Sequence, residues 1–191
     1  MQGFNGPLTQ MYCSTGAAVA SLAGDAQQLT LAIESLRLMS RVFFSLNWQD
    51  LPAFFEDNIA VWMTEFAKLL TYKNPLLESR SQDDPGPLEL LQSAVIENIN
   101  LYATKYEEEF AHYLPQFTQI IWQCLVDVPA ASKFDVLATG GIKFLSAVCT
   151  KEMNKSLFSD DVLRMLVEQI VVRNLTSSES DEELFEDNPQ V

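Results

Sequence analysis

Residues 88–128 read LELLQSAVIENINLYATKYEEEFAHYLPQFTQIIWQCLVDV. In the first half, apolar side chains recur every three or four residues, which keeps them on one face of a helix with 3.6 residues per turn. They are Leu88, Leu91, Val95, Ile99, Tyr102 and Tyr106. The second half repeats the spacing with Phe117, Ile120, Ile121, Cys124, Leu125 and Val128. Between the halves lies Leu114-Pro115, where the missing N–H of proline and its restriction on the preceding residue predict that one helix ends and another begins. So short a link predicts an antiparallel helical hairpin.

The same apolar spacing predicts four further helices and one partial helix at the start. The partial helix begins at Asn5-Gly6-Pro7 and is broken by Gly24-Asp25. The other helices start near residues 26, 54, 132 and 160, and Asn74-Pro75 ends the second of these. Gly140-Gly141 lies inside the third, at a cost of about 1 kcal/mol per glycine relative to alanine, so we expect a close approach of a neighbouring helix there.

The helix predicted over residues 26–46 is apolar on two faces. One face carries Leu29, Ile33, Leu36 and Phe43, and the other carries Leu31, Leu38 and Val42. A helix that is apolar nearly all round is buried between neighbours, as in the inner layer of stacked hairpins. Both faces are therefore predicted to be covered.

The spacing of the predicted helices indicates a repeat. First helices start near residues 26, 88 and 132, second helices near 54, 114 and 160, and the later intervals of about 44 and 46 residues are typical of HEAT or armadillo units. The predicted fold is therefore an all-α solenoid of antiparallel helix pairs, without β-strands. Its predicted parts are a partial repeat helix (1–24), HEAT-like repeats (25–76, 88–129 and 130–174), an exposed loop (77–87) and an acidic tail or start of a next repeat (175–191).

Charge and cysteine content limit the function. The net charge of −14 argues against nucleic acid and against an anionic membrane surface, and it suits partners with basic patches. No apolar run reaches the roughly 18 residues of a membrane span. Cys13, Cys124 and Cys149 fall on predicted helices and form no CxxC pair, which predicts reduced core thiols in a cytosolic or nuclear protein.

No constellation of residues indicates catalysis, a metal site or a cofactor. The only histidine, His112, has no predicted acid–base partner and is interpreted as a surface or helix-terminal residue. One histidine and three scattered cysteines give no ligand spacing for a metal. Trp48, Trp62 and Trp122 are interpreted as core residues, and Trp122 is expected to pack between the two helices of its hairpin.

The acidic stretches are the candidate partner-binding residues. One patch falls in the predicted loop and the other follows residue 178: Asp83, Asp84, Glu179, Asp181, Glu182, Glu183, Glu186 and Asp187. Acidic surface of this kind steers a basic partner and contributes specificity. The simpler alternative, that these are only solvated loops, stays open.

Three peptides carry a resemblance to a known family. They are SLNWQDLPAFFEDNIAVWM (45–63), LELLQSAVIENINLYATKYEEEFAHYLPQF (88–117) and DEELFEDNP (181–189). In this order they closely resemble the CAS-type exportin, the nuclear export receptor of the importin-β superfamily that returns importin-α to the cytoplasm. The resemblance covers the chain from about Pro7 to Pro189.

That resemblance implies a superhelix of HEAT repeats, an export complex with importin-α and Ran-GTP, and passage through nuclear pores, with nucleoporins as further partners. It also implies shuttling between nucleus and cytoplasm, and no enzymatic activity. Full-length members of the family are several times longer, so the chain is expected to be an internal segment. A constitutive helical scaffold or adaptor without transport activity is the alternative.

Overall fold

The computed structural model describes residues 2–79, 81, 83–129 and 131–172. Helices are the only regular elements among these residues, and no strand occurs there, as predicted. The long helices are α1 (Gln2–Ser21), α2 (Ala26–Asn47), α4 (Ile59–Thr71), α5 (Pro87–Lys105), α7 (Leu114–Asp127), α8 (Asp135–Cys149) and α9 (Asp160–Leu166). The shorter elements are α3 (Ala53–Asp57), α6 (Glu107–Phe110), three 3-10 turns (Pro75–Leu77, Ser132–Phe134 and Glu152–Leu157) and a π turn (Val167–Val171).

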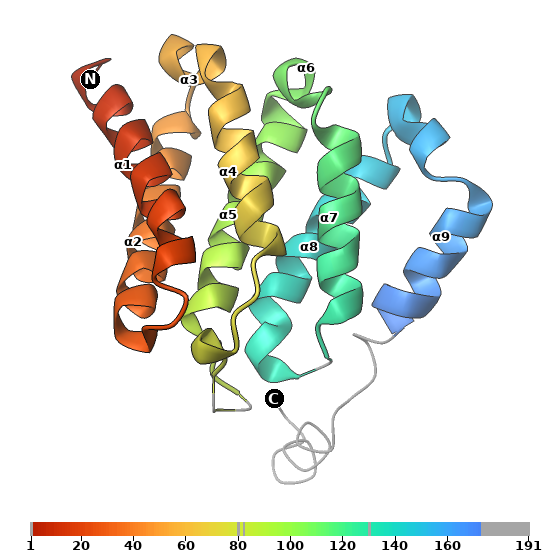
Figure 1. The fold of residues 1–191 in the computed structure, drawn as a ribbon. Coiled ribbons are helices and arrows are strands. Elements are labelled where there is room, and N and C mark those ends of the chain that lie inside the picture. Colours follow the sequence, from red (N-terminus) through yellow and green to blue (C-terminus); the bar gives the residue numbers. More distant parts are fainter. Residues whose placement is uncertain (1, 80, 82, 130, 173–191) are drawn as a thin grey trace, which may run out of the picture.

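The long helices form two layers (Figure 1). In one layer α2, α5 and α8 pack side by side, and in the other α1, α4 and α7 cover them, with α9 beyond α7 at the far end. The chain alternates between the layers, so each helix packs mainly on elements that are near it in sequence, as in a solenoid. Helix α5 packs on α4 before it as well as on α7 after it, so these contacts do not decide which helix pairs form one repeat. The grouping into repeats at 25–76, 88–129 and 130–174 therefore stays a prediction.

Several helix ends lie where the sequence predicts them. Asp25 is the N-cap of α2, and its carboxylate accepts hydrogen bonds from the backbone N–H groups of Gln27 and Gln28, both at 3.1 Å. Ser159 caps α9 by accepting from the N–H of Val162. Leu114 begins α7, with Pro115 in the first turn where no intrahelical N–H is needed.

Two predicted helix ends are wrong. The helix that starts near residue 88 ends at Lys105, not at Leu114, because Tyr106 leaves helical dihedral angles (φ −121°, ψ 52°). The buried Tyr106 hydroxyl donates to the backbone oxygen of Asn47 at the end of α2. The first helix begins at Gln2, so Pro7 lies inside it instead of at its start.

The prediction that both apolar faces of α2 are covered is also wrong. The face with Leu29, Ile33, Leu36 and Phe43 is fully buried. On the other face Leu31, Leu38 and Val42 are 52%, 55% and 38% exposed. The reason is the position of α2 at the end of its layer, where α5 packs on one side only and no described helix covers the other.

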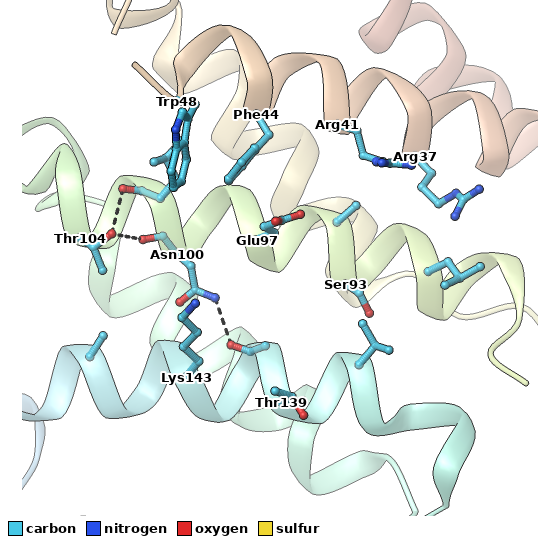
Figure 2. Close-up of a pocket in the computed structure, with 16 residues that line it drawn as sticks. Arg37, Arg41, Phe44, Trp48, Ser93, Glu97, Asn100, Thr104, Thr139 and Lys143 are labelled. Carbon is cyan, nitrogen blue, oxygen red and sulfur yellow. Dashed lines mark hydrogen bonds between the residues drawn. The ribbon is translucent and has the colours of Figure 1, made fainter. Parts of the chain in front are cut away.

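The two glycines of α8 lie where helices approach closely, as expected. A Cβ on Gly141 would stand 2.9 Å from a methyl carbon of Leu125 in α7, and one on Gly140 would stand 3.2 Å from Ile96 Cγ2 in α5. The backbone oxygen of Gly140 accepts a hydrogen bond from Asn100 Nδ2 at 3.1 Å (Figure 2). Both glycines therefore admit neighbours that larger side chains would push away.

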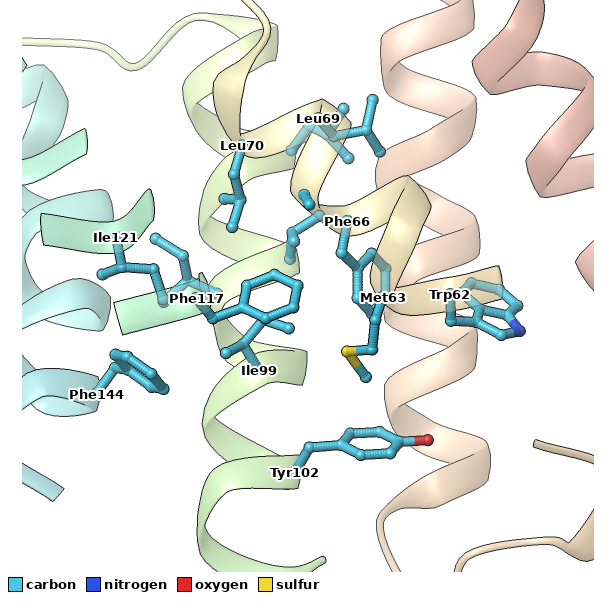
Figure 3. Close-up of a cluster of buried hydrophobic side chains, with 14 of the residues drawn as sticks. Trp62, Met63, Phe66, Leu69, Leu70, Ile99, Tyr102, Phe117, Ile121 and Phe144 are labelled. Atoms are coloured by element: carbon cyan, nitrogen blue, oxygen red, sulfur yellow. The ribbon is translucent and has the colours of Figure 1, made fainter. Parts of the chain in front are cut away.

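The core is centred on aromatic side chains of α1, α2, α4 and α5. From α4 and α5 it continues through α7 to α8 (Figure 3). Trp62 is 1% exposed, its ring stacks on Phe43 at a centroid distance of 3.9 Å, and its indole N–H donates to Thr9 Oγ1. The other two tryptophans are not core residues, contrary to prediction. Trp122 is half-buried against the core, and Trp48 is 58% exposed.

Candidate binding groove

A groove of about 740 Å³ runs along the exposed side of the α2–α5–α8 layer. Figure 2 shows α2 as one wall, α5 as the floor and α8 as the other wall. The lining residues are Arg37, Arg41 and Phe44 from α2 with Trp48 directly after it, Leu90, Ser93, Ala94, Glu97, Asn100, Leu101 and Thr104 from α5, and Val136, Thr139, Gly140, Lys143 and Ala147 from α8. Three helices that are distant in sequence thus form one continuous surface.

The groove carries an excess of positive charge. Its ionisable side chains are Arg37, Arg41 and Lys143 against the single carboxylate of Glu97. Elsewhere Lys68, Lys73, Lys151 and Lys155 form ion pairs with neighbouring carboxylates. Among the described residues, none of the three groove cations has a carboxylate within ion-pair distance. In a chain of net charge −14, this is a local concentration of unpaired cations.

Two polar atoms in the groove are buried without a hydrogen-bond partner in the described part of the chain. They are Nε of Arg37, a donor, and Oδ1 of Asn100, an acceptor. Asn100 is held in place by its other amide atom, which donates to the Gly140 oxygen on α8. A ligand that accepts from Arg37 and donates to Asn100 would satisfy both atoms.

One end of the groove is aromatic. Phe44 and Trp48 lie with their ring centroids 5.3 Å apart, and the Trp48 ring is exposed. The ammonium group of Lys105 donates to the backbone oxygens of Trp48 and Gln49 and so ties the end of α2 to the end of α5. This tie holds the exposed indole beside the groove, where it can cover an apolar group of a ligand.

Of the acidic candidates, only Asp83 and Asp84 belong to the part of the chain that the structure describes. Asp83 and Asp84 are exposed in the loop before α5, where the Asp84 carboxylate accepts from the Ser81 hydroxyl at 3.1 Å. The other six, Glu179, Asp181, Glu182, Glu183, Glu186 and Asp187, lie outside the described residues. The role of all eight stays a prediction.

Sequence reasoning missed the groove residues. A signal was available in Arg37 and Arg41, which are four residues apart on one helix and therefore share a face, in a chain with few basic residues. Glu97 and Lys143 follow no such local pattern. They line the same groove as the arginines only because α5 packs on α2 and α8 packs on α5.

The remaining candidates for chemistry are peripheral. His112 is exposed between α6 and α7, with its ring beside that of Tyr113. The three cysteines are free and half-buried, not fully buried as predicted, and burial raises the pKa of the Cys124 thiol to about 11. Within the described ranges no group of histidine, cysteine or acidic residues has the arrangement of a metal site. The described helices also include none with the length and apolar character needed to cross a membrane.

Comparison with known proteins identifies the family. The model of the Cse1 family matches residues 1–190. The chain belongs to the Cse1 family. This Cse1-family chain is 44% identical to Exportin-2 of Danio rerio over 188 residues and 42% identical to Exportin-2 of Homo sapiens over 191 residues. These alignments include 98% and 100% of this chain, but only 19% and 20% of the two relatives.

A solved structure agrees with the family assignment. The structure described as "The exportin Cse1 in its cargo-free, cytoplasmic state" matches this Cse1-family chain with a TM-score of 0.94 and 32% sequence identity. The match covers 97% of this chain and 20% of the other. The predicted helical-repeat solenoid and the resemblance to the CAS-type exportin are both confirmed. The chain spans about a fifth of the length of the relatives that it matches.

Proposed function

We propose that this chain is a segment of a nuclear export receptor that returns importin-α to the cytoplasm in complex with Ran-GTP. The observation that carries the proposal is the Cse1-family match over residues 1–190, together with relatives named Exportin-2 at 42–44% identity. A fold match at a TM-score of 0.94 supports it independently, because the matched protein is itself described as an exportin. A scaffold or adaptor without transport activity is the less favoured alternative.

In this proposal the segment works by binding and not by catalysis. It takes no cofactor, it moves between nucleus and cytoplasm with the receptor, and nucleoporins are further partners during passage. Because helices of a solenoid contact mainly their neighbours, small changes in packing angle add up along the array and let the receptor open and close around cargo. The described helices supply one part of that array.

The eight acidic residues are the proposed contact for a basic partner. Asp83 and Asp84 are exposed, which leaves their carboxylates available to another protein. Exposed charges act mainly on the association rate, since each pair is screened over about 8–10 Å at physiological ionic strength.

The test of the function uses the full-length receptor. Binding of importin-α is measured with Ran-GTP, with Ran-GDP and without Ran, and we expect strong binding only with Ran-GTP. Equal binding in all three conditions would favour the scaffold alternative. Neutralising Glu179, Asp181, Glu182, Glu183, Glu186 and Asp187 should then slow association at low salt and flatten its salt dependence, with unchanged helix content. Wild-type kinetics in that variant would identify the run as a solvated linker.

A further inference from the structure

We propose that the groove on the α2–α5–α8 layer binds an acidic, amphipathic helical segment of a partner protein. This goes beyond the proposed function, in which acidic residues of this chain meet a basic partner. The inference rests on three features of the groove: its charge, its unpaired polar atoms and its apolar lining.

The positive charge of the groove favours a negatively charged partner. Arg37 and Arg41 on one wall and Lys143 on the other face the groove without an ion-pair partner in the described part of the chain. Glu97 is the only carboxylate of the lining. The groove is thus a basic surface in an acidic protein, which attracts an acidic segment and repels a basic one.

Polar atoms and apolar surface select the kind of partner. The buried Nε of Arg37 favours a carboxylate, and the Oδ1 of Asn100 favours a hydrogen-bond donor such as a side-chain amide. The lining also contains apolar side chains, with the exposed Trp48 and Val136 on opposite walls. A long open groove with apolar anchors and charged walls is the geometry in which an amphipathic helix lays its apolar face.

Nucleic acid is the other polyanion that a basic groove attracts. The chain as a whole carries −14, and one cluster of three cations gives little of the phosphate neutralisation that nucleic-acid affinity depends on. The acidic run at 179–187 and a second copy of the chain are further candidates for occupying the groove. A segment of another protein is the proposed occupant, and binding assays distinguish it from the other three.

The first measurement uses a synthetic probe. An 18-residue fluorescein-labelled helix with leucine at positions i, i+3, i+4 and i+7 and glutamate elsewhere is titrated with the 191-residue chain, followed by anisotropy. A second probe carries lysine in place of glutamate. We expect the glutamate helix to bind at least about tenfold more tightly at low salt, and the difference to shrink at high salt. Equal affinity for both helices overturns the proposal.

Matched variants locate the binding. Arg37→Glu with Arg41→Glu should weaken the glutamate helix about tenfold, whereas Lys155→Glu with Arg164→Glu, which changes the net charge equally outside the groove, should change affinity less than about twofold. Trp48→Ala tests the apolar end without removing a core residue, since its ring is exposed, and should also weaken binding. Circular dichroism checks that each variant keeps its helix content. Equal losses in the two charge variants would show that only net charge matters and would refute the groove.

Three further outcomes reassign or reject the groove. A 15-nucleotide single-stranded DNA that binds as tightly as the glutamate helix, with the same dependence on Arg37 and Arg41, would make it a nucleic-acid site. Deletion of residues 174–191 that raises probe affinity about tenfold would assign it to the chain's own acidic run. If the chain forms a dimer, detected by sedimentation, and the dimer no longer binds the probe, the groove is occupied by a second copy of the chain. The assays contain no Ran or importin-α, so their failure leaves the export function untouched.

Discussion

The two interfaces that α5 forms within its layer are built in different ways. Towards α2, the contact consists of aromatic rings and hydrogen bonds. Phe43 and Tyr102 stack with their ring centroids 6.0 Å apart, the Tyr102 hydroxyl donates to Asn47 Oδ1, and Asn98 Nδ2 donates to the backbone oxygen of Ser40. Towards α8, close approach contributes more, because Gly140 lets the backbone of α8 come near Ile96, and Asn100 Nδ2 donates to the Gly140 backbone oxygen at 3.1 Å. The same three/four apolar spacing in sequence thus supports two kinds of helix packing.

The difference has a physical consequence for a solenoid. A buried hydrogen bond between helices specifies one register and one angle, because any other arrangement leaves a donor or an acceptor unpaired. A contact between glycine and an aliphatic side chain specifies distance but little direction. Two buried hydrogen bonds join α5 to α2, and the one from Asn100 to Gly140 that joins α5 to α8 is part-buried. We therefore expect the α2–α5 pair to move as one unit and the α5–α8 angle to change more readily along the array.

Trp62→Ala should have the largest effect on stability. The indole is buried, stacks on Phe43 and donates a hydrogen bond, so its loss should lower the free energy of unfolding by about 3–5 kcal/mol. Thermal denaturation followed by circular dichroism measures this. Trp122→Ala is the matched control, and because that side chain is half-buried its cost should be only about 1–2 kcal/mol. Equal losses would show that the two halves of the core are equivalent.

Gly141→Ala should come next. The new methyl group would stand 2.9–3.0 Å from three carbons of Leu125, itself 1% exposed, so the cost of overpacking is about 1–3 kcal/mol. Gly140→Ala meets one methyl of Ile96 at 3.2 Å, and the gain in helix propensity of up to about 1 kcal/mol should nearly offset it. Urea denaturation of both variants compares them. A stabilised Gly141→Ala protein would mean that α7 and α8 separate easily and that close approach is not required.

Much of the helical framework could be predicted from sequence, because apolar spacing and capping residues act locally. The start of α2 at Asp25, the start of α7 at Leu114 and the close approach at Gly140-Gly141 all follow from such local rules. The end of α5 at Lys105 could not be found in this way. It depends on where Tyr106 meets the end of α2, a contact between residues that are 59 apart in sequence.

The groove shows the same limit. Arg37 and Arg41 are visible in sequence as neighbours on one helix, but whether they face solvent, a carboxylate or a groove depends on how α5 packs on α2 and α8 on α5. The wrong prediction for the second apolar face of α2 has the same cause. Apolar residues on two sides of a helix predict two neighbouring helices, but among the described helices only α5 packs beside α2 within the layer.

Tyr106→Phe tests a single hydrogen bond of the α2–α5 interface. The substitution leaves the buried backbone oxygen of Asn47 without the hydroxyl donor, which should cost about 1–2 kcal/mol. Tyr113→Phe is the control, because the Tyr113 hydroxyl has no hydrogen bond within the described residues and its ring is only half-buried. Urea denaturation compares the two. If neither substitution changes the free energy of unfolding, ring packing alone holds α2 on α5 and the Tyr106 hydroxyl does not help to fix their register.

The smallest effect is expected in the other layer, where an exposed ion pair joins the ends of α4 and α7. Lys73 Nζ lies 2.5 Å from Asp127 Oδ2, and the Lys73 side chain is 72% exposed. The hydrogen bond from Lys73 is the largest cause of the lowered pKa of Asp127, followed by the one from Gln123. Since the folded-state pKa lies below the unfolded value, the stabilisation is complete above pH 3.8 and is lost as pH falls through the folded-state pKa. At neutral pH Lys73→Met should therefore cost only about 0.2–1 kcal/mol, and less in high salt, because water screens the pair. If Lys73→Met lowers the free energy of unfolding as much as Tyr106→Phe does, the exposed ion pair and the buried hydrogen bond contribute equally to stability. That result would contradict the expectation that buried contacts set the angle between helices.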